Sequence, residues 1–168
     1  MGLRVATIGV YGASGDEFLA ELERAGVDHL VDVRQRRGVR GAEYAWANAK
    51  RLQAALAEAR IGYEHRLDLA PTTELRRLQY AADAEAGEGK RSRSVLAPGY
   101  VRGYTEEILD AADEAELAED LGRHSLPALF CVERDPEACH RSLIAARLAA
   151  RHGAEIVDLR PALPNSPR

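Results

Sequence analysis

The chain has 168 residues, of which 46% are hydrophobic and 30% charged, and its formal net charge is −4. This size and composition are typical of one globular domain with a core of its own. The acidic balance argues against a protein that binds nucleic acid over its whole surface. No apolar run approaches the roughly 18 residues of a membrane span. With only two cysteines and no signal peptide, we expect a cytoplasmic protein with free thiols.

Short apolar runs alternate with helical periodicities and predict five strands separated by helices. We expect strands at residues 4–10, 30–33, 63–67, 128–132 and 155–159. We expect helices at residues 15–25, 43–60, 71–84, 104–121 and 136–152. This order is typical of the α/β class, a three-layer α/β/α sandwich with a mostly parallel sheet of about five strands. The domain should cover residues 1–160 and leave a frayed tail at 161–168, and the strand order does not follow from the sequence.

Local signals mark several element ends. Ser14 followed by Glu17 forms a capping box, and Gly26 ends that helix. Asp32 stands inside an apolar strand, where a carboxylate needs hydrogen-bond partners or a cation. Residues 85–99 contain Gly, Ser and Pro with almost no periodicity, which predicts a mobile loop.

The stretch PALFCVERDPEACHRSLIAARLAAR, residues 127–151, places reactive side chains between an apolar strand and a helix. Asp135 can cap that helix, and Pro136 suits its first position because proline has no N–H to leave unpaired there. A helix capped by Asp135 places Cys139 a full turn inside, where the effect of the helix dipole fades.

Part of this stretch, CVERDPEACHRSLIA, resembles the signature of the family called domain of unknown function 488. The strands VATIGVYG and LVDVR are similar to the Thr-Ile-Gly and Asp-Val-Arg strands of that family. The resemblance covers roughly residues 4 to 160 and implies a fold and a site, but no settled activity. Many members follow Asp-Val-Arg with a turn rich in proline and serine, whereas this chain has QRRGVRG, so no ligand role is carried over to that loop.

Parallel strands end at one edge of a sheet, and ligands bind at that edge in open α/β folds. The polar side chains that follow the predicted strands should therefore gather in one place. We expect ligand contacts from Arg34, Arg141, Tyr11, Gly12 and His65, and chemistry from Cys139, His140 and Glu133.

The two cysteines have several possible roles. Cys139 beside a charged imidazole or guanidinium would have a lowered pKa and could act as a nucleophile, or it could simply pack the helix onto the sheet. Cys131 lies in an apolar strand and is expected in the core. A zinc site could use both cysteines with His140 and either His65 or Glu133. The sequence lacks the close Cys-x-x-Cys pairs typical of such sites, so we predict no metal and no cofactor.

The charged residues also leave alternatives open. Arg141 could hold phosphate in its planar fork, or it could pair with Asp32 or Glu133. His140 could act as general acid or base, or it could fix the loop by a hydrogen bond. Glu133 could orient His140, act as a base, or pair with Arg34.

A basic segment could form a phosphate-binding patch or a solvated loop. Its arginines are Arg34, Arg36, Arg37 and Arg40, and Lys90, Arg91 and Arg93 could join them. Tyr44 and Trp46 could stack on a base, although Trp46 falls on an apolar stripe and suits the core.

Three functions are compatible with these patterns. The first is binding of a phosphate-bearing or nucleotide-like anionic ligand, with or without chemistry on it. The second is a thiol enzyme of the sulfurtransferase or phosphatase type. Its arginine should lie six residues after the cysteine, where this chain has Ala145 or Glu137. The third is a non-catalytic module that binds nucleic acid through Arg36, Arg37 and Arg40. The oligomeric state does not follow from the sequence.

Overall fold

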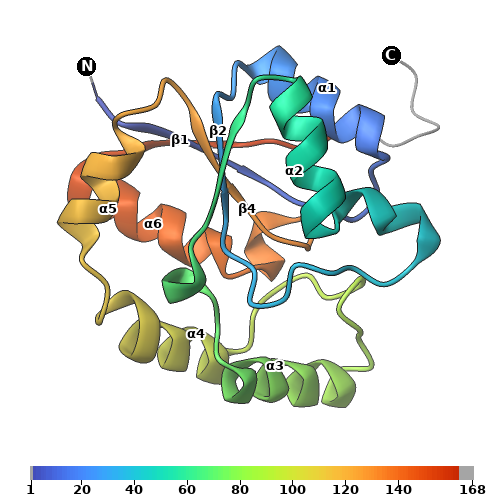
Figure 1. Ribbon diagram of the computed structural model, residues 1–168. Coiled ribbons are helices and arrows are strands. Elements are labelled where there is room, and N and C mark those ends of the chain that lie inside the picture. The colour runs from blue at the N-terminus through green and yellow to red at the C-terminus, as the bar shows by residue number, and fades with distance from the viewer. Residues whose placement is uncertain (1, 163–168) are drawn as a thin grey trace.

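The computed structural model describes residues 2–162 (Figure 1). Five parallel strands form one sheet in the order β3-β2-β4-β1-β5. They are β1 (Arg4–Ile8), β2 (His29–Asp32), β3 (Gly62–His65), β4 (Pro127–Phe130) and β5 (Glu155–Asp158). The predicted α/β sandwich with a parallel sheet is confirmed, and every strand lies within two residues of its predicted start. Of the tail expected at 161–168, residues 163–168 lie outside the described part of the chain.

Helices cover both faces of this sheet, with α1 and α2 on one side and α5 and α6 on the other (Figure 1). The helices are α1 (Gly15–Ala25), α2 (Ala49–Glu58), α3 (Thr73–Glu85), α4 (Pro98–Tyr104), α5 (Glu114–Leu121) and α6 (Arg141–His152). Right-handed crossovers carry the chain over one face from β1 to β3 and over the opposite face from β3 to β5. The loops after the neighbouring strands β2 and β4 therefore diverge, and they open a crevice at the carboxyl edge of the sheet.

The core lies on both sides of β4, all four residues of which are buried. On one face Phe18 packs edge-on against Phe130, with ring centroids 5.3 Å apart. On the other face α6 buries Ile144 and Leu148. Complete burial of each such side chain stabilises the fold by about 1.5–3 kcal/mol.

The exits of β1 and β4 touch at Gly9. A Cβ atom at Gly9 would lie 1.9 Å from the carbonyl oxygen of Glu133. The backbone N–H groups of Val10 and Tyr11 both donate to the carbonyl of Val132, at 2.9 and 3.0 Å. The glycine is therefore required for the loop after β4 to lie against the end of β1.

Two predicted helices are interrupted. The predicted helix 43–60 is a 3₁₀ helix, Ala42–Ala47, followed by α2, because Asn48 is extended and its Oδ1 accepts from the N–H of Val39 at 2.8 Å. The predicted helix 104–121 starts earlier, at Pro98. Its middle, Thr105–Leu109, is a π-helix, and it ends before α5, where Asp113 caps a new helix.

The helix after β3 buries a different face from the predicted one. Thr72 caps α3 by accepting from the N–H of Leu75, but the residues buried with Leu75 are Gln79 and Asp83. Hydrophobic periodicity places Leu75, Leu78 and Ala82 on one face of this helix, but Leu78 is 42% exposed. Polar partners in the neighbouring loop satisfy the buried amide and carboxylate, which hydrophobic periodicity cannot predict.

The start of the last helix also differs from the prediction. Pro136–Ala138 form a short 3₁₀ helix, and the Asp135 side chain makes no capping hydrogen bond. Cys139 is extended, with φ −135° and ψ 145°, and His140 is the N-cap of α6. Cys139 therefore precedes the helix instead of lying a turn inside it.

Candidate functional site

A partly open pocket lies at the carboxyl edge of the sheet, between the loops after β2 and β4 and one side of α3. Its lining is Arg34, Gln35, Arg36, Pro71, Arg76, Gln79, Tyr80, Lys90, Arg93, Tyr100, Cys131, Val132, Glu133 and His140. Of the eight predicted site residues, only Arg34, Glu133 and His140 line it. The pocket contains many cations and a single carboxylate, that of Glu133.

Arg34 and Asp32 form a buried ion pair beneath this pocket. Arg34 donates from Nε and Nη2 to the two carboxylate oxygens of Asp32, at 2.8 and 2.7 Å, and from Nη1 to the carbonyl of Ala47, at 2.9 Å. Tyr63 donates its hydroxyl to the same carboxylate at 2.6 Å. The prediction that Asp32 needs hydrogen-bond partners or a cation is confirmed, because it has both. All three guanidinium nitrogens of Arg34 are engaged within the protein.

Arg93 connects the irregular loop before α4 to the loop after β4. Its Nε donates to Asp83 Oδ2 at 3.0 Å, and its Nη1 lies 3.5 Å from Glu133 Oε1 and 3.2 Å from the carbonyl of Ala138. Gln79 donates to Asp83 and accepts from the N–H of Ala97. The segment predicted as a mobile loop thus supplies a buried arginine to the pocket.

Burial dominates the chemistry of the Glu133 carboxyl. Its side chain is 8% exposed, and desolvation raises its pKa to about 7. The neighbouring Cys139 raises the pKa further, whereas the charges of Lys90 and Arg93 oppose the shift. Glu133 is therefore balanced between its two protonation states near neutral pH.

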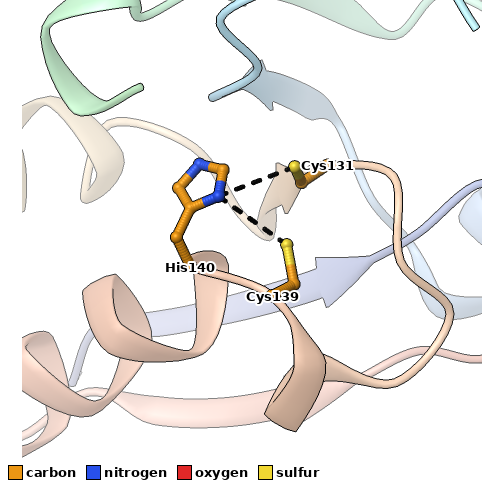
Figure 2. A group of neighbouring side chains, drawn as sticks. All are labelled: Cys131, Cys139 and His140. Atoms are coloured by element: carbon orange, nitrogen blue, oxygen red, sulfur yellow. Dashed lines mark hydrogen bonds between the residues drawn. The ribbon is translucent and has the colours of Figure 1, made fainter. Parts of the chain in front are cut away.

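Cys131, Cys139 and His140 converge on one another (Figure 2). His140 Nδ1 lies 3.7 Å from the sulfur of Cys131 and 3.8 Å from that of Cys139. His140 Nε2 lies 2.8 Å from the carbonyl oxygen of Val33. A carbonyl only accepts, so Nε2 carries the hydrogen and Nδ1 is left facing the two sulfurs.

The two thiols differ in acidity. Burial alone would raise the pKa of Cys139, but the hydrogen bond from Cys131 and the charges of Arg141 and His140 outweigh it and hold the pKa well below its ordinary value. Burial raises the pKa of Cys131, and the neighbouring Cys139 raises it further. Burial disfavours the charge of His140, but Cys139 and the hydrogen bond to Val33 raise the imidazole pKa. Cys139 and His140 thus favour a thiolate–imidazolium pair.

Arg141 is completely buried and holds the loop after β4. Its Nη1 and Nη2 donate to the carbonyls of Glu133 and Arg134, at 2.6 and 3.0 Å. It pairs with the carboxylate of neither Asp32 nor Glu133, and it does not line the pocket. Arg141 therefore joins the loop after β4 to the start of α6.

The remaining predicted ligand residues, Tyr11, Gly12 and His65, do not line the pocket. Tyr11 packs against Tyr44 with ring centroids 5.4 Å apart, and the N–H of Gly12 donates to the Tyr44 hydroxyl at 3.0 Å. His65 Nε2 donates to the carbonyl of Arg34 at 2.7 Å. These residues brace the loops around the pocket.

The basic segment after β2 is divided between the pocket and the surface. Arg36 is exposed and lines the pocket. Arg37 donates to Tyr63, and the carbonyl of Arg40 accepts from Arg91. Trp46 is half-buried and packs against the core residue Phe18, with ring centroids 4.8 Å apart, which agrees in part with its expected place in the core.

Lys90 and Arg36 differ from the other pocket cations. Neither forms a side-chain hydrogen bond or ion pair with any residue between 2 and 162. Burial works against the charge of Lys90, but Glu133 and Cys131 outweigh it and raise its pKa. The sequence indicated Lys90 as part of a basic patch, but it gave no sign of Arg76, Gln79, Tyr80 or Asp83, which come from the polar side of α3.

This architecture defines a doubly wound α/β protein with a cationic pocket at the carboxyl edge of its sheet. The family model "Domain of unknown function DUF488" matches residues 14–148, and the chain belongs to that family. The resemblance stated from the sequence is thereby confirmed. No curated protein and no solved structure matches the chain. Between residues 2 and 162, no helix has both the length and the apolar character needed to cross a membrane.

Proposed function

We propose that the pocket binds a small anionic ligand that carries a phosphate group, such as a nucleotide. The observation that carries this proposal is the pair Lys90 and Arg36. Both line the pocket, and neither has a carboxylate partner among the described residues. A cation that lines a pocket without a direct ion pair favours an anionic ligand.

The balance of charge around the pocket supports this proposal. Asp32 forms an ion pair with Arg34, and both Asp83 and Glu133 form ion pairs with Arg93. Among the described residues, Arg76 donates to neutral groups only, to Gln35 at 2.8 Å and to the hydroxyl of Tyr80 at 2.9 Å. Within residues 2–162, Arg36 and Arg76 therefore contribute positive charge that no carboxylate pairs with. Lys90 adds a further positive charge, which it shares with Arg93 beside the single pocket carboxylate, Glu133.

Tyr80 supports a nucleotide over inorganic phosphate. Tyr80 lines the pocket and is 37% exposed as a residue, and the Arg76 guanidinium lies over its ring, 5.6 Å from the centroid. A partly exposed aromatic side chain beside cations suits a nucleobase attached to a phosphate.

The predicted residues take different parts in this proposal. Glu133 and His140 line the pocket and are the candidates for chemistry on a bound ligand. Cys139 is 1% exposed and does not line the pocket, so the thiol-enzyme alternative has weaker geometric support. Arg34 and Arg141 position the walls of the pocket.

A thermal-shift screen with phosphate, AMP, ADP and short oligonucleotides tests the proposal. A ligand at a hundred times its dissociation constant should raise the free energy of unfolding by about 2.7 kcal/mol. We expect the shift to shrink in Lys90→Ala and to persist in Lys50→Ala, which removes an exposed lysine from α2.

Two results would overturn the proposal. One is the absence of a shift with every anion. The other is a shift with oligonucleotides only that Arg37→Ala and Arg40→Ala abolish and Lys90→Ala does not. That second result, with a steep loss of affinity in salt, would favour the nucleic-acid module.

A further inference from the structure

We propose that Cys131, Cys139 and His140 form a zinc-binding site beside the pocket, with the fourth coordination position open to it. Thiolate sulfur and imidazole nitrogen are the preferred ligands of Zn²⁺. The three ligand atoms all lie within 4.8 Å of one another, and all three side chains are buried. The inference does not depend on the proposed anionic ligand.

The separations match those of a tetrahedral site. With Zn–S near 2.3 Å and Zn–N near 2.0–2.1 Å, tetrahedral angles place sulfur and nitrogen about 3.6 Å apart. His140 Nδ1 lies 3.7 Å from the Cys131 sulfur and 3.8 Å from the Cys139 sulfur. The two nitrogen–sulfur separations therefore need little change to accept the ion.

His140 is already oriented as a metal ligand. Its Nε2–H donates to the carbonyl of Val33, which fixes the tautomer and directs Nδ1 at the two sulfurs (Figure 2). A ligating histidine commonly donates its other ring N–H to a carboxylate or a backbone carbonyl in this way. The end of β2 thus holds a ligand that comes from the start of α6.

Backbone hydrogen bonds and backbone conformation also position the two thiols. The N–H of Cys131 donates to the carbonyl of Ile8, which ties it to the end of β1. Cys139 is extended and His140 is helical, with φ −60° and ψ −20°. This change of conformation turns two adjacent side chains toward Cys131 (Figure 2).

The surrounding charges suit a site with two thiolates. Lys90, Arg93 and Arg34 line the adjoining pocket, whose single carboxylate is that of Glu133. Two thiolates cancel the charge of Zn²⁺, so the bound site adds no net charge to a cationic region. Cys131 and His140 line the pocket, and a site with three protein ligands keeps one position for water or substrate.

Cobalt substitution of the full chain without a tag tests this site. After reduction and chelation, one equivalent of Co²⁺ should give the near-ultraviolet thiolate charge-transfer band and the visible bands of tetrahedral coordination. Zn²⁺ should then bleach these bands at one equivalent. Cys131→Ser, Cys139→Ser and His140→Ala should each weaken or abolish the bands. His152→Ala, at the far end of α6, should retain them.

The wild-type spectrum decides the question even where a substitution prevents folding. The metal spectrum of a variant is interpreted only if its far-ultraviolet circular dichroism matches that of the folded wild type. A reduced, folded wild type that shows no thiolate band with Co²⁺ overturns the proposal. So does a band of undiminished intensity in a folded Cys131→Ser variant. Preferential formation of an intramolecular disulfide, with no metal uptake after reduction, also overturns it.

Discussion

Arg34 and Asp32 form a double hydrogen bond at the end of β2, and the two side chains are 1% and 0% exposed. We predict that Asp32→Asn lowers the free energy of unfolding by about 3–5 kcal/mol, because it leaves a buried guanidinium without its counter-ion. Urea denaturation measures this loss. As a control, Arg4→Ala breaks an exposed pair with Glu155 and should cost at most about 1 kcal/mol. Equal losses in the two variants would contradict the assignment.

Arg141→Lys separates a structural role from a ligand-binding role. Lysine cannot span the carbonyls of Glu133 and Arg134 with one planar fork, so we expect a loss of about 1.5–3 kcal/mol in the free energy of unfolding. Ligand affinity of the folded variant should stay near the wild-type value, since Arg141 does not line the pocket. Denaturation and calorimetry measure the two quantities. Unchanged stability with lost affinity would show that Arg141 binds the ligand itself.

Gly9→Ala should distort the loop after β4. Its Cβ would collide with the backbone of Glu133, and such overpacking costs about 1–3 kcal/mol or more. Gly89→Ala is the control, because nothing lies within 4 Å of the added atom. Thermal denaturation of the two variants should differ clearly. Equal melting temperatures would mean that β1 and this loop do not touch as described.

Asp28 lies at the end of the sheet opposite the pocket, and its carboxylate should make the free energy of unfolding depend on pH. Its carboxylate accepts from the N–H groups of Ser125 and Leu126, at 2.8 and 2.9 Å. Burial alone would raise its pKa, but these backbone hydrogen bonds outweigh it and lower the pKa. The contribution to stability is therefore complete above the ordinary pKa of about 3.9 and is lost as the pH falls through the lowered value.

Asp28→Asn should accordingly destabilise the protein at neutral pH, and the difference from wild type should shrink steadily below about pH 4. Urea titrations at a series of pH values measure that difference. A difference that is constant with pH would show that the carboxylate charge is not what holds the start of β4.

The sequence was sufficient for the strands and for part of the site. Apolar runs bounded by turn residues locate each strand, and their alternation with helices predicts a parallel sheet. Side chains alternate along extended backbone, so Asp32 and Arg34 were expected on one side of the chain. Their pairing with each other was not predicted, because the sequence offered Arg141 as a partner for Asp32 and Glu133 as a partner for Arg34.

Other contacts depend on segments that are distant in sequence. Arg93 lies in a stretch without periodicity, and its partners Asp83 and Glu133 come from α3 and from the loop after β4. The strand order that unites them does not follow from local patterns. Asp135 and Pro136 begin a 3₁₀ turn as readily as a helix, so the position of Cys139 outside α6 was not predictable.

We propose that the cationic pocket binds its phosphate-bearing ligand through Lys90. The most direct test is calorimetric titration of the best nucleotide from the screen into wild type, Lys90→Ala and Lys50→Ala. We predict one site per chain, a dissociation constant at least about tenfold higher for Lys90→Ala, equivalent to about 1.4 kcal/mol, and no change for Lys50→Ala. Equal affinity in wild type and Lys90→Ala, or no saturable binding to wild type, would contradict the account.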